Sequence, residues 1–517
     1  MLSLLYQEPE TGPKVNCLKD LNLDQIVTTL CLSKEVCDYV LSVLEQPLQN
    51  PDNLIYRQDI CQDFYTNPDL FRELTEICRN YTLVKPEWDR LMAGMRSKGS
   101  RMQAESNNLD FIRDTIAALE TNALYCGKIA AFPEELLEVL NKYPIKSKGL
   151  IKIKEFCETR LNDQEYIRLR ELAQEFSEVA PMIDKGCEIS VDISENLYGA
   201  ASHLIKLKLH QDENEKRQSL FRTLFGRSEE QPESEAGVQI TIDKTIRVEL
   251  VTLINEAMKE ISGLFVIIAR KIYSDFVNLA DELWLYRFAL RLKRVYDRLG
   301  VPYCFPKIMP ADEDIFECSE LYDLFLLVRD YTGKFAVRNV VPNDIHLSGD
   351  RIGLLVQGDN SSGKTTFLRA IGTAQLLAQA GLPTASRTAI TSIRRKILAQ
   401  FSGEDSLAVG DSAGRFETEV MEVAEIIRQL EPYSLVLFNE TFQTTAFAEA
   451  APAVYDILDV ISTAKVKWIF VTHLLELYER FSASDNNVLF LKTSSDPETR
   501  YKLVPMQLTS SARNKVE

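Results

Sequence analysis

A glycine-rich run from Gly358 to Thr365 has the residue types and the spacing that bind a nucleotide phosphate. It reads Gly-Asp-Asn-Ser-Ser-Gly-Lys-Thr, fits G-x-x-x-x-G-K-[ST], follows an apolar run of strand length and opens a helical pattern. Lys364 would meet the β- and γ-phosphates, and the Thr365 hydroxyl would be a Mg²⁺ ligand. The backbone amides that would point at a phosphate, at the positive end of the helix dipole, belong to Ser361, Ser362 and Gly363.

Hydrolysis of a bound nucleotide also needs a carboxylate near the attacking water, and a later apolar strand supplies one. The run Leu-Val-Leu-Phe-Asn-Glu ends at Glu440, which is placed to orient or deprotonate water; the alternative is a solvated loop acid. Asn439 stands where most such enzymes carry an Asp that holds the Mg²⁺ shell. An amide oxygen accepts a hydrogen bond from a Mg²⁺-bound water but brings no negative charge. We therefore expect ATP binding, with Thr365 and Asn439 at the metal, and slow turnover.

A histidine follows the next apolar strand, in the run Val-Thr-His that ends at His473. Such a side chain can hydrogen-bond near a γ-phosphate and report its presence, because its neutral and charged forms lie close in energy at physiological pH. The alternative interpretation is a structural histidine at a strand end. Its position after two other nucleotide elements favours the first interpretation, so His473 joins Glu440 as a candidate catalytic residue.

The composition is that of a globular chain with several domains. Its 517 residues are 45% hydrophobic and carry 59 Lys and Arg against 76 Asp and Glu, a net charge of -17. This balance argues against a protein that coats nucleic acid by bulk charge, because counterion release needs clustered cations. No apolar stretch reaches the length of a membrane span, and the N-terminus has no basic leader, so we expect a cytoplasmic protein without a membrane partner. The ten cysteines form no C-x-x-C pair, which favours buried thiols.

The two parts of the chain have different periodicity. Residues 1–300 show apolar residues at three- and four-residue spacing, which predicts helix after helix. The clearest helical patterns cover 21–44, 69–81, 107–124, 163–176, 246–268 and 276–299, and the last two predict a long helix pair or stalk.

After residue 300, short apolar runs alternate with helical patterns, as in a parallel sheet covered by helices. The expected strands cover 353–357, 434–438, 467–471 and 487–491. We therefore predict a helical region at 1–300 and an α/β domain with the phosphate loop at 301–517.

These motifs resemble those of the MutS family of DNA mismatch-repair ATPases, which are relatives of the ABC ATPases. The family's phosphate loop reads G-P-N-M-G-G-K-S-T, and Asn360 and Thr366 fall on its Asn and its last Thr. Asn439-Glu440 corresponds to the family's D-E, and 472–477 corresponds to T-H-x-x-E-L. Upstream, the run Val-Pro-Asn-Asp-Ile at 341–345 is similar to the family's approach to the nucleotide strand.

The resemblance implies a P-loop NTPase domain of ABC/MutS type behind a helical lever and clamp region. It extends into the helical part at 56–70 and 88–91, and a clamp-like insertion would lie at about 140–240. It further implies ATP and Mg²⁺ as ligands, and a homodimer of ATPase domains whose levers close around double-stranded DNA. Because lever-like helices begin almost at once, we do not expect the family's N-terminal mismatch-recognition domain with its F-x-E wedge.

The loop that in this family reaches the partner subunit's ATP is altered. The family has S-T-F-M-x-E-M, and this chain has Gly-Arg-Phe-Glu-Thr-Glu-Val at 414–420. Phe416 and Glu419 match, whereas Ser412 lies two positions before the family's serine. Arg415 could replace that serine as a cation aimed at a γ-phosphate in trans; a surface arginine is the alternative.

Binding to DNA phosphates needs cations in the helical part, and two runs are candidates. Residues 142–154 carry five lysines and no acid. The second run contains His203, Lys206, Lys208, Lys216, Arg217 and Arg222. For both runs the alternative is a solvated face.

Two functions agree with these observations. The first is an ATP-binding and ATP-hydrolysing protein that closes on DNA as a dimeric clamp, in mismatch repair or a related DNA transaction. The alternative is an ATP-gated interaction protein that engages a protein or a structured RNA, with slow or no hydrolysis.

Overall fold

The structure is a computed structural model, which divides into two compact units. It describes residues 2–82, 128–164, 166–168, 170–171, 187–196, 199–209, 275–333, 340–348, 350–401, 412–442, 447–483, 487–494 and 496–506. The first unit contains Met1–Leu2, Asp69–Ile145 and Leu150–Ala280, and the second contains Ser3–Pro68, Lys146–Gly149 and Asp281–Glu517. The boundary predicted at residue 300 follows the change of periodicity, whereas these units follow packing, which groups the first helices with the sheets.

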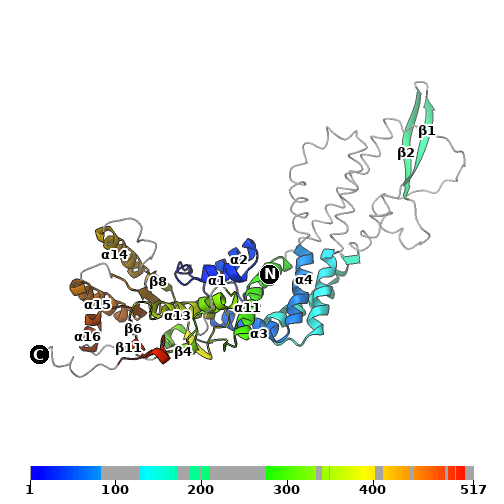
Figure 1. The fold of residues 1–517 in the computed structure, drawn as a ribbon. Helices are drawn as coiled ribbons and strands as arrows, with labels where there is room; N and C mark the ends of the chain where they lie inside the picture. The colour runs from blue at the N-terminus through cyan, green and yellow to red at the C-terminus, as the bar shows by residue number, and fades with distance from the viewer. Residues whose placement is uncertain are drawn as a thin grey trace. The chain divides into compact units, whose positions relative to one another are not determined.

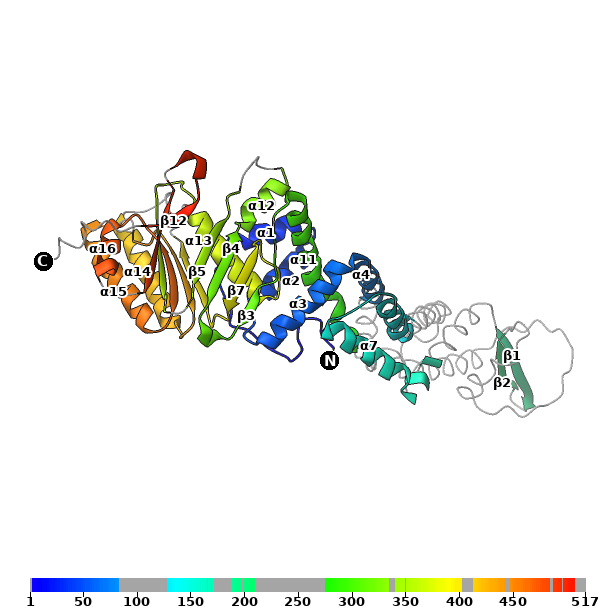
Figure 2. The ribbon, with the colours of Figure 1, turned by 90° about the horizontal axis from the view of Figure 1, so that it is seen from below.

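The second unit contains a six-stranded sheet, with β12 at one edge (Figure 2). In spatial order its strands are β12 (Leu503–Pro505), β11 (Val488–Thr493), β6 (Gly353–Gln357), β10 (Lys467–Val471), β9 (Leu435–Asn439) and β8 (Ile397–Phe401). Neighbouring strands are parallel except for β11 and β12. The four strands predicted from the sequence are confirmed, and the sheet with its helices has the P-loop NTPase fold.

Helices cover both faces of this sheet. On one face lies α13 (Lys364–Gln379), which packs closely on the sheet: a Cβ atom at Gly372 would lie 2.7 Å from a methyl group of Leu437 in β9. The other face carries α14 (Ser412–Gln429), α15 (Phe447–Thr463) and α16 (Leu475–Ala483). Their apolar residues share one buried cluster with alternate strand residues such as Val436, Phe438 and Trp468. This alternation explains why each strand reads as a continuous apolar run.

A four-stranded sheet and several helices complete the second unit. The strand order is β3 (Lys307–Met309), β7 (Thr388–Ser392), β4 (Phe316–Leu321) and β5 (Asn343–Leu347). The helices are α1 (Leu23–Leu30), α2 (Lys34–Leu44), α3 (Pro51–Thr66), most of α11 (Leu279–Leu299), α12 (Leu324–Tyr331), and the short 3₁₀ turns η2 (Ala311–Glu313) and η4 (Pro497–Thr499).

The helical predictions can be checked where the structure describes the chain. The pattern at 21–44 forms α1 and α2, that at 69–81 forms α4 (Pro68–Thr82), and that at 276–299 forms α11. Residues 128–142 and α7 (Lys148–Leu161) are also helical. The predicted helices at 107–124 and 246–268 lie outside the described residues, and that at 163–176 is described only in part. In the described chain, no helix combines the length and the apolar character needed to cross a membrane.

One described segment of the first unit departs from the predicted succession of helices. It is an antiparallel hairpin of β1 (Cys187–Asn196) and β2 (Gly199–Leu209) (Figure 1). The helical prediction is wrong here because the period is two: Ile189, Val191 and Ile193 alternate with polar residues. In the second candidate basic run, His203, Lys206 and Lys208 lie in β2, at register positions opposite Asp192, Ser190 and Glu188.

Candidate nucleotide-binding site

The phosphate loop connects β6 to α13 and depends on glycine at two positions. At Gly358 a Cβ atom would lie 2.1 Å from the Thr493 hydroxyl oxygen, so a side chain would collide with β11. Gly363 is the N-cap of α13 and has φ of 96°, in the left-handed region that favours glycine. Ser361, between them, also has a positive φ, of 62°. These constraints turn the loop sharply before the helix begins.

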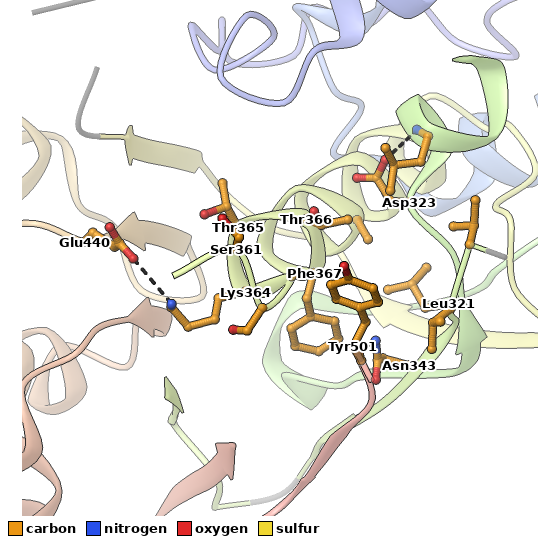
Figure 3. A pocket seen from close by; sticks show the side chains of 16 residues that line it. Leu321, Asp323, Asn343, Ser361, Lys364, Thr365, Thr366, Phe367, Glu440 and Tyr501 are labelled. Carbon is orange, nitrogen blue, oxygen red and sulfur yellow. Dashed lines mark hydrogen bonds and ion pairs between the residues drawn. The ribbon is translucent and has the colours of Figure 1, made fainter. Parts of the chain in front are cut away.

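The Lys364 ammonium is buried inside this loop, with a side chain only 3% exposed. Its Nζ atom donates hydrogen bonds of 2.8 Å to the carbonyl oxygens of Gly358 and Asp359. It also lies 3.2 Å from His473 Nε2 and 3.5 Å from Glu440 Oε1 (Figure 3 draws the Lys364–Glu440 pair). Burial lowers the pKa of Lys364, and the Glu440 carboxylate partly offsets that effect.

The predicted residues come together because β6, β9 and β10 are adjacent and parallel, so their carboxyl ends share one edge of the sheet. The Glu440 amide donates to the Val471 carbonyl oxygen at 2.9 Å, which ties the two strand ends together. Glu440 Oε1 then lies 3.0 Å from His473 Nε2. Glu440 itself has φ of 57°, a left-handed conformation that is uncommon for a non-glycine residue and characteristic of functional turns.

Thr365 and Asn439, the predicted Mg²⁺ ligands, contact each other. The Thr365 hydroxyl donates to Asn439 Oδ1 at 2.9 Å. A hydroxyl and an amide oxygen at this separation are hard oxygen donors of the kind that Mg²⁺ binds alongside phosphate oxygens and water. In the parts of the chain that the structure describes, no group of three or more His, Cys, Asp or Glu could hold a metal alone. The residues therefore fit a Mg²⁺ that arrives with a nucleotide.

A cavity of about 360 Å³ opens beside the loop (Figure 3). This volume lies in the range of small-ligand pockets. The predicted residues that line it are Ser361, Ser362, Gly363, Lys364, Thr365, Thr366 and Glu440. Ser362 Oγ is buried and, among the described residues, has no hydrogen-bond partner, so it is available to a ligand. Gly358 and Asn360 do not line the cavity, and Asn360 is exposed.

The candidate trans-acting residues begin α14. Ser412 is the first residue of this helix, and Arg415 and Phe416 follow within it; the side chains of these three lie outside the described part of the structure. Glu419 is described, and its Oε2 atom accepts a hydrogen bond of 2.8 Å from the Phe442 amide. Glu419 therefore fixes the segment directly after Glu440 to α14.

The cavity also has walls that were not among the predicted site residues. Asp323, Asn343 and Tyr501 line it, from the cap of α12, the start of β5 and the turn before β12. Burial raises the pKa of Asp323 to about 6, and its carboxylate accepts the Leu326 amide at 2.7 Å as the cap of α12. The motif at 341–345 could have indicated Asn343. Nothing near Tyr501 in the sequence indicates that it lines a cavity, because only chain folding brings it to the phosphate loop.

Two segments of the chain match models of known protein families. Residues 354–512 match MutS domain V, and residues 49–299 match the MutS2 N-terminal domain. The first match contains the phosphate loop, Glu440 and His473, and the second contains the helices α3, α4 and α7. The chain belongs to the MutS family.

Individual relatives agree with this family. The DNA mismatch repair protein MutS of Granulibacter bethesdensis is 36% identical over 138 residues, which are 26% of this chain and 15% of that protein. Endonuclease MutS2 of Geobacillus kaustophilus is 32% identical over 169 residues, which are 32% of this chain and 21% of that protein. Endonuclease MutS2 of Streptococcus equi subsp. equi is 32% identical over 142 residues, 27% and 18% of the two chains. The matched segments thus span about a fifth or less of these relatives.

Proposed function

We propose that this MutS-family chain binds ATP with Mg²⁺ in the phosphate loop and hydrolyses it slowly. The observation that carries the proposal is the convergence on Lys364 Nζ of groups from three strand ends: the loop carbonyls after β6, Glu440 after β9 and His473 after β10. The adjoining cavity and the unpartnered Ser362 hydroxyl support a bound phosphate chain.

Each residue has a distinct part in the proposed reaction. Lys364 Nζ exchanges its contacts with the loop carbonyls and Glu440 for phosphate oxygens, which releases the Glu440 carboxylate to face the attacking water. The water oxygen bonds to the γ-phosphorus, its proton passes to Glu440, and the bond from the γ-phosphorus to the β–γ bridging oxygen breaks. His473 orients Glu440 through the 3.0 Å contact. Thr365 and Asn439 would hold a Mg²⁺ that shields phosphate charge, and the neutral Asn439 would hold it more weakly than a carboxylate.

We further propose that the chain acts as an ATP-gated dimeric clamp on double-stranded DNA. The names of the relatives, a DNA mismatch repair protein and endonucleases of the MutS2 type, support DNA as the partner. The β2 strand adds three basic residues, His203, Lys206 and Lys208, of which His203 and Lys208 lie at register positions opposite the acidic Asp192 and Glu188. Lys216, Arg217 and Arg222 of the same run lie outside the described residues.

The other basic run favours the alternative function, an ATP-gated protein that engages a protein or a structured RNA. The Lys142 ammonium donates a hydrogen bond to the Glu73 carboxylate at 2.6 Å. Part of the charge at 142–154 is therefore already matched within the chain, which reduces its capacity to release counterions from DNA.

Titration calorimetry with a non-hydrolysable ATP analogue and Mg²⁺ tests the nucleotide site. Lys364→Ala should weaken binding at least about hundredfold, because a charge-assisted contact to two phosphates is lost. Lys492→Ala, which removes an exposed lysine of β11, is the matched control and should bind as the parent chain does. Equal binding by the Lys364→Ala variant would reject the site.

Duplex binding at two salt concentrations, with and without ATP, separates the two proposed partners. A DNA clamp binds plain, mismatched or branched duplexes with an affinity that falls steeply with salt and changes with ATP. Absence of salt-sensitive binding to every duplex would remove the DNA proposal and leave the alternative.

A further inference from the structure

At the end of the cavity away from Glu440, two residues from distant parts of the chain form part of the wall. Figure 3 shows Tyr501 and Asn343 side by side at that end, away from Glu440 and the Lys364 ammonium. Asn343 begins β5 in the four-stranded sheet, whereas Tyr501 stands in the turn that leads into β12, at the edge of the six-stranded sheet. The contact between them therefore joins the two sheets beside the phosphate loop.

The Asn343 amide holds the backbone of this turn at two points. Its Nδ2 donates to the Tyr501 carbonyl oxygen at 3.1 Å, and its Oδ1 accepts the Leu503 amide at 2.7 Å. The side chain is 7% exposed, so both bonds are shielded from water. One primary amide thus satisfies a donor and an acceptor two residues apart, which an aspartate or an aliphatic residue could not do.

The turn held in this way has a conformation that needs such support. Tyr501 has φ of 72°, which is unfavourable for a residue with a large side chain. Its ring approaches the phosphate loop: a Cβ atom placed on Gly363 would lie 3.3 Å from Tyr501 Cδ1. The Arg500 guanidinium covers the ring at 4.9 Å from its centroid. Tyr501 is nevertheless 39% exposed and lines the cavity, so its ring is an aromatic surface that remains available to a ligand.

We propose that Asn343 is a positioning residue that holds Tyr501 as an aromatic wall for the nucleoside part of the ligand. This inference rests on the proposed nucleotide site and assigns the phosphates and the base of the ligand to different residues. Lys364 binds the phosphates, and Tyr501, which Asn343 holds in position, contacts the base. The surrounding walls agree with an aromatic occupant, because Leu321, Leu326 and Val341 present apolar side chains to the same cavity.

The separate roles of Lys364 and Tyr501 are tested by comparing ATP with inorganic tripolyphosphate, which carries the phosphate chain without a base. Calorimetric titrations with Mg²⁺ use the full chain. Tyr501→Ala should weaken ATP binding about tenfold, as expected for loss of one aromatic stacking partner, and leave tripolyphosphate binding within about twofold. Tyr501→Phe, which keeps the ring, should restore ATP binding. Glu498→Gln, an exposed change in the same turn region, is the control and should alter neither ligand.

The role of Asn343 is tested in the same assay. Asn343→Ala should weaken ATP binding by about threefold to tenfold and spare tripolyphosphate, and Asn343→Asp, which keeps only the acceptor for the Leu503 amide, should do the same. In the Tyr501→Ala background, Asn343→Ala should have no further effect on ATP binding, because the residue acts through the ring. Thermal unfolding of each variant identifies any loss that comes from misfolding.

Two results would overturn this inference while the phosphate site stands. One is an equal loss of ATP and tripolyphosphate binding in Tyr501→Ala, and the other is an additive loss from Asn343→Ala in that background. If the parent chain bound neither ligand, the proposed nucleotide site itself would fail, and the two failures are thereby distinguished.

Discussion

Two buried lysines lie at opposite ends of the same parallel sheet, and they differ in what surrounds them. Lys364 follows the carboxyl end of β6, whereas Lys467 is the first residue of β10, at its amino end. Both side chains are shielded from solvent, at 3% and 0% exposure, and each has a carboxylate within 4 Å: Glu440 at 3.5 Å and Asp314 at 3.2 Å. Burial lowers the pKa of both amines, that of Lys467 to about 8.

What separates the two lysines is the space around them and the other contacts that they and their partner carboxylates make. Lys364 lines a cavity, and its partner Glu440 sits on a turn directly after a strand. Lys467 donates to the Arg351 carbonyl oxygen at 2.7 Å, and Asp314 also binds the fully buried Arg394. A buried lysine with a carboxylate is therefore no sign of function by itself; a cavity that admits a ligand is the distinguishing feature.

The largest effect is expected at the amino end of the sheet. Asp314→Asn keeps the shape and tolerates the positive φ of that residue but leaves the Lys467 and Arg394 cations without a countercharge. We expect the free energy of unfolding to fall by about 3 kcal/mol in urea titrations, with nucleotide affinity unchanged in the folded fraction.

Glu320→Gln is the matched control for this change. Glu320 also has a positive φ and pairs with an arginine, Arg387, but the pair is exposed, so its loss should change the free energy of unfolding by less than about 0.5 kcal/mol. If both variants lost the same stability, the buried cluster would have no special role and the comparison would fail.

The next effect concerns catalysis at the carboxyl end. Glu440→Gln keeps the turn but removes the proposed general base, so steady-state ATP turnover should fall about hundredfold while ATP affinity changes by only a few-fold. Glu431→Gln, just before the amino end of the same strand β9, removes an exposed carboxylate and should leave turnover unchanged. Turnover that survives in Glu440→Gln would place the general base elsewhere.

A pH titration of stability tests the lowered pKa of Lys467. Its pKa is about 8 in the folded chain and 10.5 ordinarily, so between these values the unfolded chain binds more protons and stability from this group rises with pH. The free energy of unfolding of the parent chain, minus that of Lys467→Met, should increase by about 2 kcal/mol from pH 8 to about pH 9.5. A difference that stays flat, or falls, would show that Lys467 is not held with a lowered pKa.

The smallest effect is expected from placing a carboxylate at the proposed metal site. Asn439→Asp places a negative charge beside the Thr365 hydroxyl and should raise the apparent Mg²⁺ affinity in the ATPase assay about tenfold. Asn487→Asp, an exposed change just before the amino end of β11, controls for the added charge. Equal Mg²⁺ dependence in the parent and Asn439→Asp chains would remove Asn439 from the metal site.

Much of the site was predictable because its residues sit at fixed places in local patterns. The phosphate loop, Glu440 and His473 each follow an apolar strand. Adjacent parallel strands bring their carboxyl ends to one edge of the sheet, so these residues meet there. The hairpin at 187–209 was missed because the helical periodicity on either side of it outweighed a short run of alternation. Tyr501 and Asp323 were missed because their neighbours in the sequence carry no sign of a ligand.

The amino-acid sequence alone identifies the residues that could hold a phosphate chain, since a tight glycine turn and a following helix are encoded within nine consecutive positions. That Asn343 and Tyr501, 158 positions apart, meet beside that loop follows from the fold, as does the difference between Lys364, which lines a cavity, and Lys467, which lies in a buried ion cluster with Asp314 and Arg394. The physical reason is that cavities and long-range hydrogen bonds arise from how sheets and turns pack, and packing involves residues that no local pattern connects.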